Sequence, residues 1–200
     1  MNTATVIQPA INPGVISSAE PMETDEALYE TVHGQRVEMP PMSIRAVIVT
    51  TRISSSLNAF ARPKGLGEAF TELLIHVPLP EDKSRDRRPD VAFFAYPRSP
   101  STLTELPDAN AWDLIPDLAI EVTSPSDRAE AQREKVLEYF QAGVRLVWVV
   151  YPNLRLIDVY DSPTTIRVFG PGGVLTGDPV LPEFELAFED LFAPFAPPST

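Results

Sequence analysis

Residues 116–152, "PDLAIEVTSPSDRAEAQREKVLEYFQAGVRLVWVVYP", decide the fold. Their apolar pattern predicts a buried strand over 118–124, a helix from about 126 to 142 and a second strand over 144–150. Gly143 stands where a helix commonly ends. A strand, a helix and a strand in succession form a βαβ unit, which implies two parallel strands joined by a right-handed crossover.

The segments on either side of this unit predict antiparallel hairpins rather than further βαβ units. Two strand-like segments follow it, at 155–161 and 165–170, and the short apolar segment 90–96 precedes it. A helix-length pattern over 43–65 is closed by Pro63. The sequence therefore predicts an α/β protein, α+β by a strict definition, with one mixed central sheet flanked by helices.

The length of 200 residues favours a single domain. Residues 1–20 show no hydrophobic period, so we interpret them as a flexible arm. We expect one domain over 21–192 and a loose tail over 193–200.

Composition narrows the classes of function. The chain has no cysteine, which excludes disulfides, a thiolate nucleophile and a cysteine zinc site. The net charge of −12 argues against broad adhesion to nucleic acid or anionic lipid, although it leaves room for a local basic patch. No signal peptide and no apolar run of membrane-spanning length is visible, so we expect a cytoplasmic protein without a membrane partner.

Glu121 is the first candidate site residue. Because side chains alternate along a strand, Leu118, Ile120 and Val122 point to one face of the sheet and Glu121 points to the other. A buried, unpaired carboxylate costs several kcal/mol or becomes protonated, so it needs a metal ion or a cationic partner. The simpler alternatives are an exposed strand end and a structural pair with Arg or Lys.

Asp90 is the second candidate, because it follows Pro89 at the head of the apolar segment 90–96, which can lie beside the strand of Glu121. Asp117 competes with it, but Asp117 lies four residues from Glu121 on one strand, or about 13 Å at 3.3 Å per residue. One metal ion does not easily bridge that gap. Asp90 is therefore the better ligand, and we expect Asp117 to organise the start of its strand.

The helix supplies a candidate cation. Val136, Leu137 and Phe140 are predicted to form the stripe that faces the core. Lys135 lies beside this stripe, on one face with Tyr139. A lone helical lysine is usually solvated, but the short turn before this helix lets its inner side lean over the preceding strand.

Five segments of the sequence, taken together and in this order, form a recognisable pattern: "YETVHGQRVEMPP" (29–41), "RRPDVAFF" (87–94), "PDLAIEVTSPSDR" (116–128), "EKVLEYFQAGVRLVWVVYP" (134–152) and "IDVY" (157–160). Together they resemble the Uma-two family of restriction-endonuclease-like proteins, within the PD-(D/E)XK nuclease superfamily. The resemblance implies a restriction-endonuclease-like fold. It also implies that Asp90 and Glu121 are metal ligands, that Lys135 is a catalytic lysine displaced onto the helix, and that Glu30 is a further acid near the same centre.

Two positions depart from the superfamily pattern. The residue two positions after Glu121 is Thr123 rather than lysine, which is why the resemblance assigns the lysine to the helix. The segment "MSIRAVIV" (42–49) lacks the histidine that family members often have there, so no histidine is assigned a role.

These observations predict a metal-dependent endonuclease that hydrolyses DNA phosphodiester bonds. Mg²⁺ held by Asp90 and Glu121 would polarise the phosphate and lower the pKa of a bound water, and Mn²⁺ can substitute for it. Carboxylate ligands without thiolates favour these ions over zinc. Lys135 would stabilise the charge that develops in the transition state, and Glu30 would position a water or a second ion. We further expect the carboxylate oxygens of Asp90 and Glu121 to approach within about 4–5 Å, and Lys135 to point to the same pocket.

Two other functions stay open. The chain could be a catalytically silent module with a nuclease fold that binds nucleic acid or a protein partner, or a related enzyme that acts on another phosphate-containing substrate. Family members resemble dimers, so the apolar segment 184–195 is either part of a homodimer interface or a cap on the core of the monomer. The basic run "KSRDRRP" (83–89) is either a phosphate contact or a solvated loop.

Overall fold

The structure is a computed structural model, and it describes residues 27–96, 109–125 and 127–194. The arm predicted for 1–20 and residues 195–200 of the predicted tail lie outside these ranges. The helices are α1 (Ile44–Ala61), α2 (Ala129–Ala142) and α3 (Phe188–Phe192). The strands are β1 (Tyr29–Val32), β2 (Gln35–Glu38), β3 (Gly67–Thr71), β4 (Ile75–His76), β5 (Asp86–Arg87), β6 (Val91–Ala95), β7 (Leu118–Val122), β8 (Leu146–Tyr151), β9 (Leu156–Ser162), β10 (Thr165–Phe169), β11 (Val174–Gly177) and β12 (Leu181–Ala187). Within the described ranges, no helix has both the length and the apolar character needed to cross a membrane.

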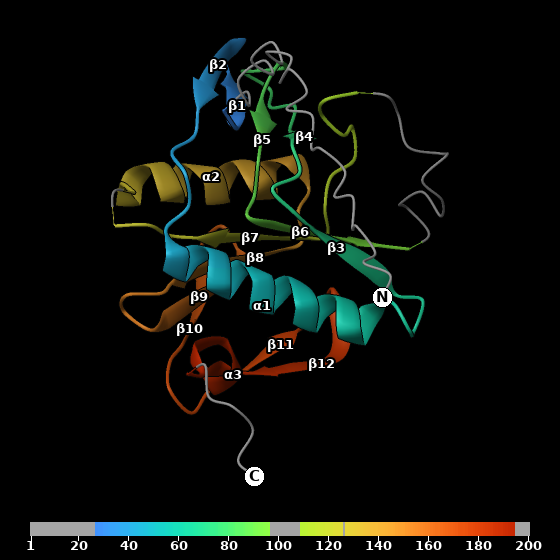
Figure 1. Cartoon of the computed structure of the whole chain (residues 1–200). Helices are drawn as coiled ribbons and strands as arrows, with labels where there is room; N and C mark the ends of the chain where they lie inside the picture. The colour runs from blue at the N-terminus through green and yellow to red at the C-terminus, as the bar shows by residue number, and fades with distance from the viewer. Residues whose placement is uncertain (1–26, 97–108, 126, 195–200) are drawn as a thin grey trace, which may run out of the picture.

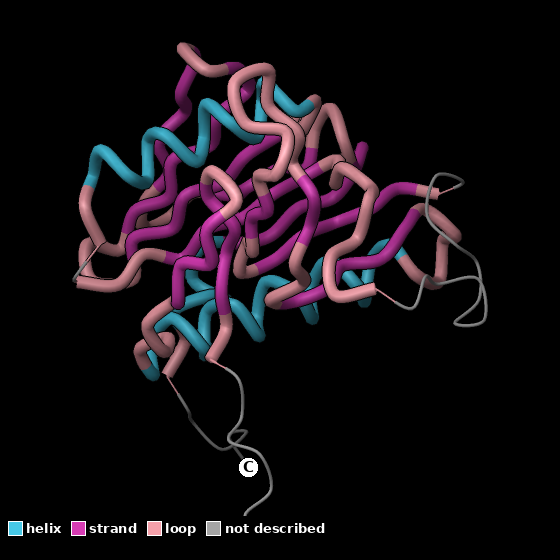
Figure 2. The backbone as a smooth tube through the Cα atoms, turned by 90° about the horizontal axis from the view of Figure 1, so that it is seen from above, coloured by secondary structure: helices cyan, strands magenta, loops and turns pink. Residues whose placement is uncertain are grey.

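A mixed sheet forms the centre of the molecule. In the part of the chain that the structure describes, its six strands lie in the order β10-β9-β8-β7-β6-β3 (Figure 1, Figure 2). β7 and β8 are parallel, with Leu118 opposite Leu146, and the other neighbouring pairs are antiparallel. Because α2 connects the parallel pair, the predicted βαβ unit and the predicted mixed sheet flanked by helices are confirmed.

Helices cover both faces of this sheet, and Figure 1 shows α1 and α2 on opposite sides of it. Leu118, Ile120 and Val122 pack into the apolar cluster that contains the inner side of α1. On the other face, Ala119 packs in the cluster of Val136 and Tyr139 from α2. The alternation expected along β7 therefore turns Glu121 toward α2, away from the larger apolar core.

The buried side of α2 differs from the predicted stripe. Val136 and Tyr139 are fully buried, whereas Leu137 is 44% exposed and Phe140 is only partly buried. At about 100° per residue, Leu137 lies too far around the helix to share the inner face with Val136 and Tyr139. The inner face is thus set by residues 135, 136 and 139, so Lys135 lies on the side that faces the sheet.

A second, smaller sheet brings Glu30 to the site. It has the order β2-β1-β5-β4, and Figure 1 shows it beyond α2 from the central sheet. The turn between β1 and β2 contains His33 and Gly34, both with positive φ. The basic run 83–89 is not a solvated loop, because Arg85 and Arg87 are buried and β5 lies within it. Their charges are tolerated because acidic side chains surround them, as described below.

The apolar C-terminal segment packs on α1. Phe184, Phe188 and Leu191 belong to the same buried cluster as Ile53 and Leu57. These residues therefore cap the core of the monomer, which was one of the two roles considered for them. The homodimer itself stays a prediction.

Candidate active site

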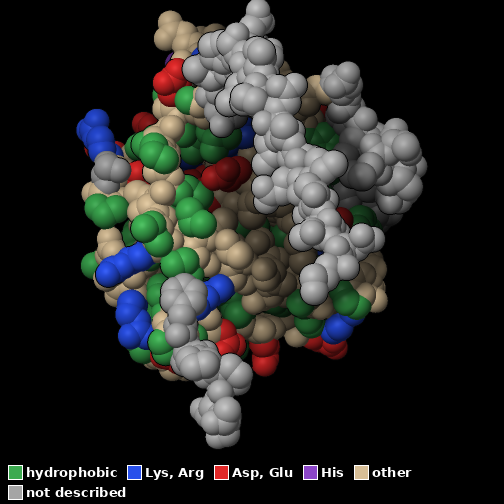
Figure 3. Space-filling model, viewed as in Figure 1, with side chains coloured by type: hydrophobic (Ala, Val, Ile, Leu, Met, Phe, Trp, Pro, Cys, Tyr) green, Lys and Arg blue, Asp and Glu red, His purple; other side chains and the backbone are tan. Residues whose placement is uncertain are grey.

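A cavity of about 280 Å³ lies where β1, β7 and α2 meet the segment that leads into α1. One wall is apolar and consists of Val37, Met39, Pro40, Pro41 and Met42. The remaining wall carries five acidic and two basic side chains, namely Glu30, Glu38, Asp90, Glu121, Asp127, Arg128 and Lys135. Figure 3 shows acidic side chains in a recess of the surface that hydrophobic side chains border. All four predicted site residues, Glu30, Asp90, Glu121 and Lys135, therefore line one cavity.

Asp90 and Glu121 come from neighbouring antiparallel strands. Val91 is opposite Ile120 in this pair. Asp90, which precedes Val91, and Glu121, which follows Ile120, therefore lie side by side. Oδ2 of Asp90 accepts the backbone N–H of Val122 at 2.5 Å. Burial, reinforced by the nearby charge of Glu121, raises the pKa of Asp90 to about 8. The two carboxyl groups are thus close enough to interact, and an approach of their oxygens to metal-bridging distance stays a prediction.

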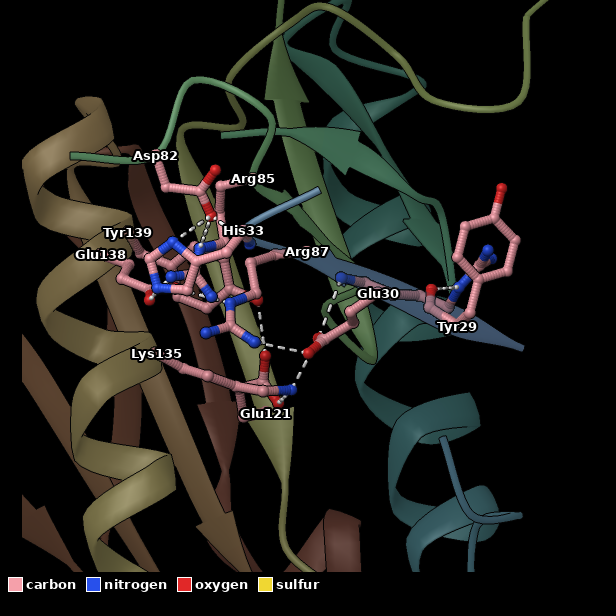
Figure 4. Close-up of polar contacts among 11 residues, drawn as sticks. Tyr29, Glu30, His33, Asp82, Arg85, Arg87, Glu121, Lys135, Glu138 and Tyr139 are labelled. Atoms are coloured by element: carbon pink, nitrogen blue, oxygen red, sulfur yellow. Dashed lines mark hydrogen bonds and ion pairs between the residues drawn. The ribbon is translucent and has the colours of Figure 1, made fainter. Parts of the chain in front are cut away.

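Lys135 reaches back from α2 to the strand that carries Glu121. Its Nζ donates to Oε1 of Glu30 at 2.8 Å and to Oε2 of Glu121 at 3.3 Å (Figure 4). The side chain is only 16% exposed. Burial alone would lower the pKa of Lys135, but the charges of Glu121 and Glu30 raise it above the usual range. The ammonium is therefore held charged inside the cavity, between two carboxylates.

Glu30 is buried and has two cationic partners. It accepts from Nζ of Lys135, from Nη1 of Arg87 at 2.6 Å, and from the backbone N–H of Arg88 at 3.2 Å. Burial alone would raise the pKa of Glu30, but Lys135 and Arg87 together hold it below its ordinary value. Glu30 therefore stays ionised and fixes the ammonium of Lys135 from the side of the small sheet.

The ion pairs continue beyond Glu30 along α2. Nε of Arg87 donates to Oε2 of Glu138 at 2.5 Å, and Nη2 of Arg85 lies 3.4 Å from Oε1 of Glu138. Arg85 in turn lies 3.1 Å from Oδ2 of Asp82. Figure 4 shows this chain of alternating charges leading from Glu121 and Lys135 to Asp82.

Tyr139 is a site residue to which the sequence assigned no role. Its O–H donates to Oε1 of Glu121 at 2.6 Å, so Glu121 is held by the tyrosine on one oxygen and by Lys135 on the other. Burial raises the pKa of Glu121 above its ordinary value, although each of these two contacts lowers it. The spacing between Lys135 and Tyr139, one turn apart on a helix, was the available signal for this contact.

Asp117 does not belong to the site. It is buried at the start of β7, where its Oδ2 accepts the backbone N–H of Ala95 at 2.9 Å. Its Oδ1 lies 3.5 Å from Nη1 of Arg145. These contacts tie the start of β7 to β6 and to the segment before β8, in agreement with the organising role expected for it.

The donor set of the cavity suits a hard cation. Across the described ranges, no group of three or more His, Cys, Asp or Glu side chains is arranged to hold a metal ion. Two neighbouring carboxyl groups are nevertheless a usual protein contribution to a Mg²⁺ site, where waters and substrate phosphates supply the remaining ligands. Asp90 and Glu121 are the residues that fit this description.

Comparisons with known proteins agree with the fold and the motifs. A family model described as "Putative restriction endonuclease", named Uma2, matches residues 18–189. A crystal structure described as "a putative nuclease belonging to DUF820" from Anabaena variabilis ATCC 29413 has a TM-score of 0.70 and 23% sequence identity, and the similarity covers 82% of this chain and 89% of that one. At this identity the similarity shows a shared fold. No curated protein matches the chain. Since the family model matches most of its length, the chain belongs to the Uma2 family of restriction-endonuclease-like proteins.

Proposed function

We propose that this protein is a divalent-metal-dependent endonuclease that hydrolyses phosphodiester bonds of DNA. The observation that carries the proposal is the convergence of Asp90, Glu121 and Lys135 in one cavity, from two neighbouring strands and the helix that follows. The family description supports a nuclease in general, and the side chains of the cavity support the metal-dependent form.

Asp90 and Glu121 are the residues that would hold Mg²⁺ or Mn²⁺. Burial, reinforced by the nearby charge of Glu121, raises the pKa of Asp90 to about 8, so a cation can replace the proton that otherwise neutralises this carboxyl group. When bound, the ion would polarise a phosphate oxygen and make a bound water more acidic. The absence of thiolates and of clustered histidines in the described cavity favours these hard ions over zinc.

Lys135 would act on the phosphate itself. Its ammonium is held charged by Glu121 and Glu30, and it lines the cavity that the scissile phosphate would enter. A fixed cation that faces the developing negative charge stabilises the transition state without reorganisation. Glu30 and Tyr139 would serve as positioning residues, Glu30 for Lys135 and Tyr139 for Glu121.

The test separates metal binding from cleavage. Asp90→Asn and Glu121→Gln should each abolish Mg²⁺-dependent nicking of supercoiled DNA and weaken Mn²⁺ binding measured by calorimetry. Asp161→Asn removes an exposed carboxylate that pairs with Arg167, and it is the matched control expected to leave both unchanged. If Asp90→Asn cleaves DNA and binds Mn²⁺ as the wild type does, Asp90 is not a metal ligand and the proposal fails.

One observation favours a second candidate, a catalytically silent module. Lys135 is already paired with both Glu30 and Glu121, so its ammonium neutralises part of the negative charge that a metal ion would otherwise balance. In that case the wild type would cleave no DNA with Mg²⁺ or Mn²⁺, and Asp90→Asn would leave its ligand affinity intact. Calorimetry with Mn²⁺ alone distinguishes the candidates, since only the nuclease requires a site for the ion.

A further inference from the structure

A second hollow of the surface is lined by three arginines and, among its described lining residues, by no acidic side chain. Its volume is about 290 Å³, and the arginines are Arg45 and Arg52 from α1 and Arg155 from the turn after β8. We call it the arginine pocket. The chain contains 28 acidic and 16 basic residues, so a local excess of positive charge runs against its overall composition. Such a concentration of guanidinium groups is the electrostatic pattern that attracts anions.

The arginine pocket is connected to the active site. A third hollow of about 480 Å³ shares Asn153 with the arginine pocket and shares Ser124, Asp127, Arg128 and Gln132 with the site cavity. Ser124 and Asn153 follow the carboxyl ends of the parallel strands β7 and β8, which lie at the same edge of the sheet. In Figure 1 the loops after β7 and β8 and the start of α1 lie along one side of the molecule, and Figure 3 shows Lys and Arg side chains on that side. The three hollows therefore follow one another along this side of the molecule, and we call them together the groove.

Two of the arginines keep hydrogen-bonding capacity for a ligand. Nη1 of Arg45 donates to Oδ1 of Asn153 at 2.9 Å, and this acceptor is neutral. Nη2 of Arg155 pairs with Glu189 at 3.0 Å, in an exposed ion pair that water screens. A guanidinium has five N–H donors, so each of these contacts occupies only part of its capacity.

The charge of the two ends of the groove differs in sign. The site cavity carries five acidic against two basic side chains, so a DNA phosphate gains little affinity there. Affinity for a nucleic acid comes mainly from basic side chains that neutralise backbone phosphates and release counterions. The groove places such side chains apart from the acids of the site cavity, where they can contact a strand without competing for those carboxylates.

We infer that the arginine pocket binds backbone phosphates of the nucleic acid whose scissile bond lies at Asp90 and Glu121. The inference rests on the proposed function for the identity of the polyanion, and it adds the surface that holds it. Arg45 and Arg155 contact phosphates rather than bases, so binding through this pocket is independent of sequence.

Fluorescence anisotropy of a short labelled DNA duplex tests the inference in the presence of a chelator, where no cleavage occurs. Arg45→Gln and Arg155→Gln should each lower the affinity, and each should reduce the slope of log affinity against log salt by about one. The matched control is Arg62→Gln, which lies at the opposite end of α1 and pairs with Glu68. It should keep the wild-type slope. Circular dichroism checks that each variant is folded.

The outcomes separate this inference from the proposed function. Wild-type affinity and slope in the Arg45→Gln, Arg155→Gln double variant would overturn the inference, even if the protein cleaves DNA. Loss of binding in the double variant supports it, even if no metal ever produces cleavage, in which case only the proposed function fails. Inorganic phosphate serves as the second probe. If it displaces DNA at equal concentration, the pocket serves a small anion and the assignment to a nucleic-acid backbone is overturned.

Discussion

The buried ion network along α2 has two ends that differ in charge balance. At the site end, Glu121 and Glu30 share the single ammonium of Lys135, and the carboxyl group of Asp90 lines the same cavity. At the closed end, Arg85 and Arg87 face Glu138 and Asp82, so cations and anions are matched one to one. A balanced buried network can hold two sheets and a helix together, whereas an unbalanced one has room for a further cation. The difference separates a structural role from a chemical one within a single chain of contacts.

The largest expected effect comes from removing the ammonium at the site end. Lys135→Met should lower Mg²⁺-dependent DNA cleavage by about two to three orders of magnitude, the usual effect of losing one electrostatic group from a transition state. Single-turnover assays, with the enzyme in excess over the DNA, measure this rate. Lys135→Met also leaves two buried glutamates facing each other, so the variant should be less stable than the wild type. Lys135→Arg keeps the charge and should retain most of the stability. Equal cleavage by Lys135→Met and the wild type would remove the catalytic role.

The closed end should affect stability more than chemistry. Arg87→Met leaves Glu30 and Glu138 without their shared guanidinium, and breaking such a buried pair costs about 3–5 kcal/mol of unfolding free energy. Urea denaturation measures the loss. Arg167→Met is the control, since it removes an exposed pair with Asp161 that is worth about 0–1 kcal/mol. If Arg87→Met is as stable as Arg167→Met, the closed end is not a structural element and the contrast between the two ends fails.

The network also shows how far sequence reasoning reaches. The parallel pair, the orientation of Glu121 and the location of Lys135 on the following helix depend on local periods of two and about 3.6, which can be counted along the chain. The partners of Arg87 cannot be found in this way, because Glu30 and Glu138 lie 57 and 51 residues from it. From the sequence alone, a solvated loop is therefore one of two interpretations of the run 83–89, whereas the pairing of its arginines determines its burial. Leu137 was misplaced for a related reason, since a helix face that carries a lysine and a tyrosine does not resemble an apolar stripe.

The protonation of Asp90 is expected to make stability depend on pH in the presence of a chelator. The pKa of Asp90 is about 8 in the folded protein and has an ordinary value of 3.8. Between these values the folded state binds more protons than the unfolded state, so stability falls as pH rises and levels off above about pH 8. Urea denaturation of the wild type should show this decline between about pH 5 and pH 8. In Asp90→Asn the amide can still accept the N–H of Val122, and the decline should be weaker, with the remainder coming from Glu121, whose pKa burial also raises. Equal pH dependence in both proteins would contradict the raised pKa.

Added Mg²⁺ sharpens the same experiment. An ion that binds the folded state alone stabilises it, and binding needs the deprotonated carboxylate of Asp90. Mg²⁺ should therefore raise the unfolding free energy of the wild type more at about pH 8 than at about pH 6, and it should leave Asp90→Asn unchanged. Stabilisation of both proteins to the same extent would place the ion elsewhere.

The smallest effect is expected from the hydroxyl of Tyr139, which lies on the side of Glu121 away from Glu30. Tyr139→Phe removes the donor to Oε1 of Glu121 but keeps the packing of the ring, so it should cost about 1–2 kcal/mol of unfolding free energy. If Tyr139 positions Glu121 as a ligand, the Mg²⁺ concentration for half-maximal cleavage should rise several-fold, while the rate at saturating Mg²⁺ stays near that of the wild type. Tyr96→Phe removes the hydroxyl of an exposed ring and should change neither quantity. A loss of stability without any shift in the Mg²⁺ dependence would show that Tyr139 has a structural role only. Glu121 would then serve both roles, with one oxygen held by a structural residue and the other by Lys135.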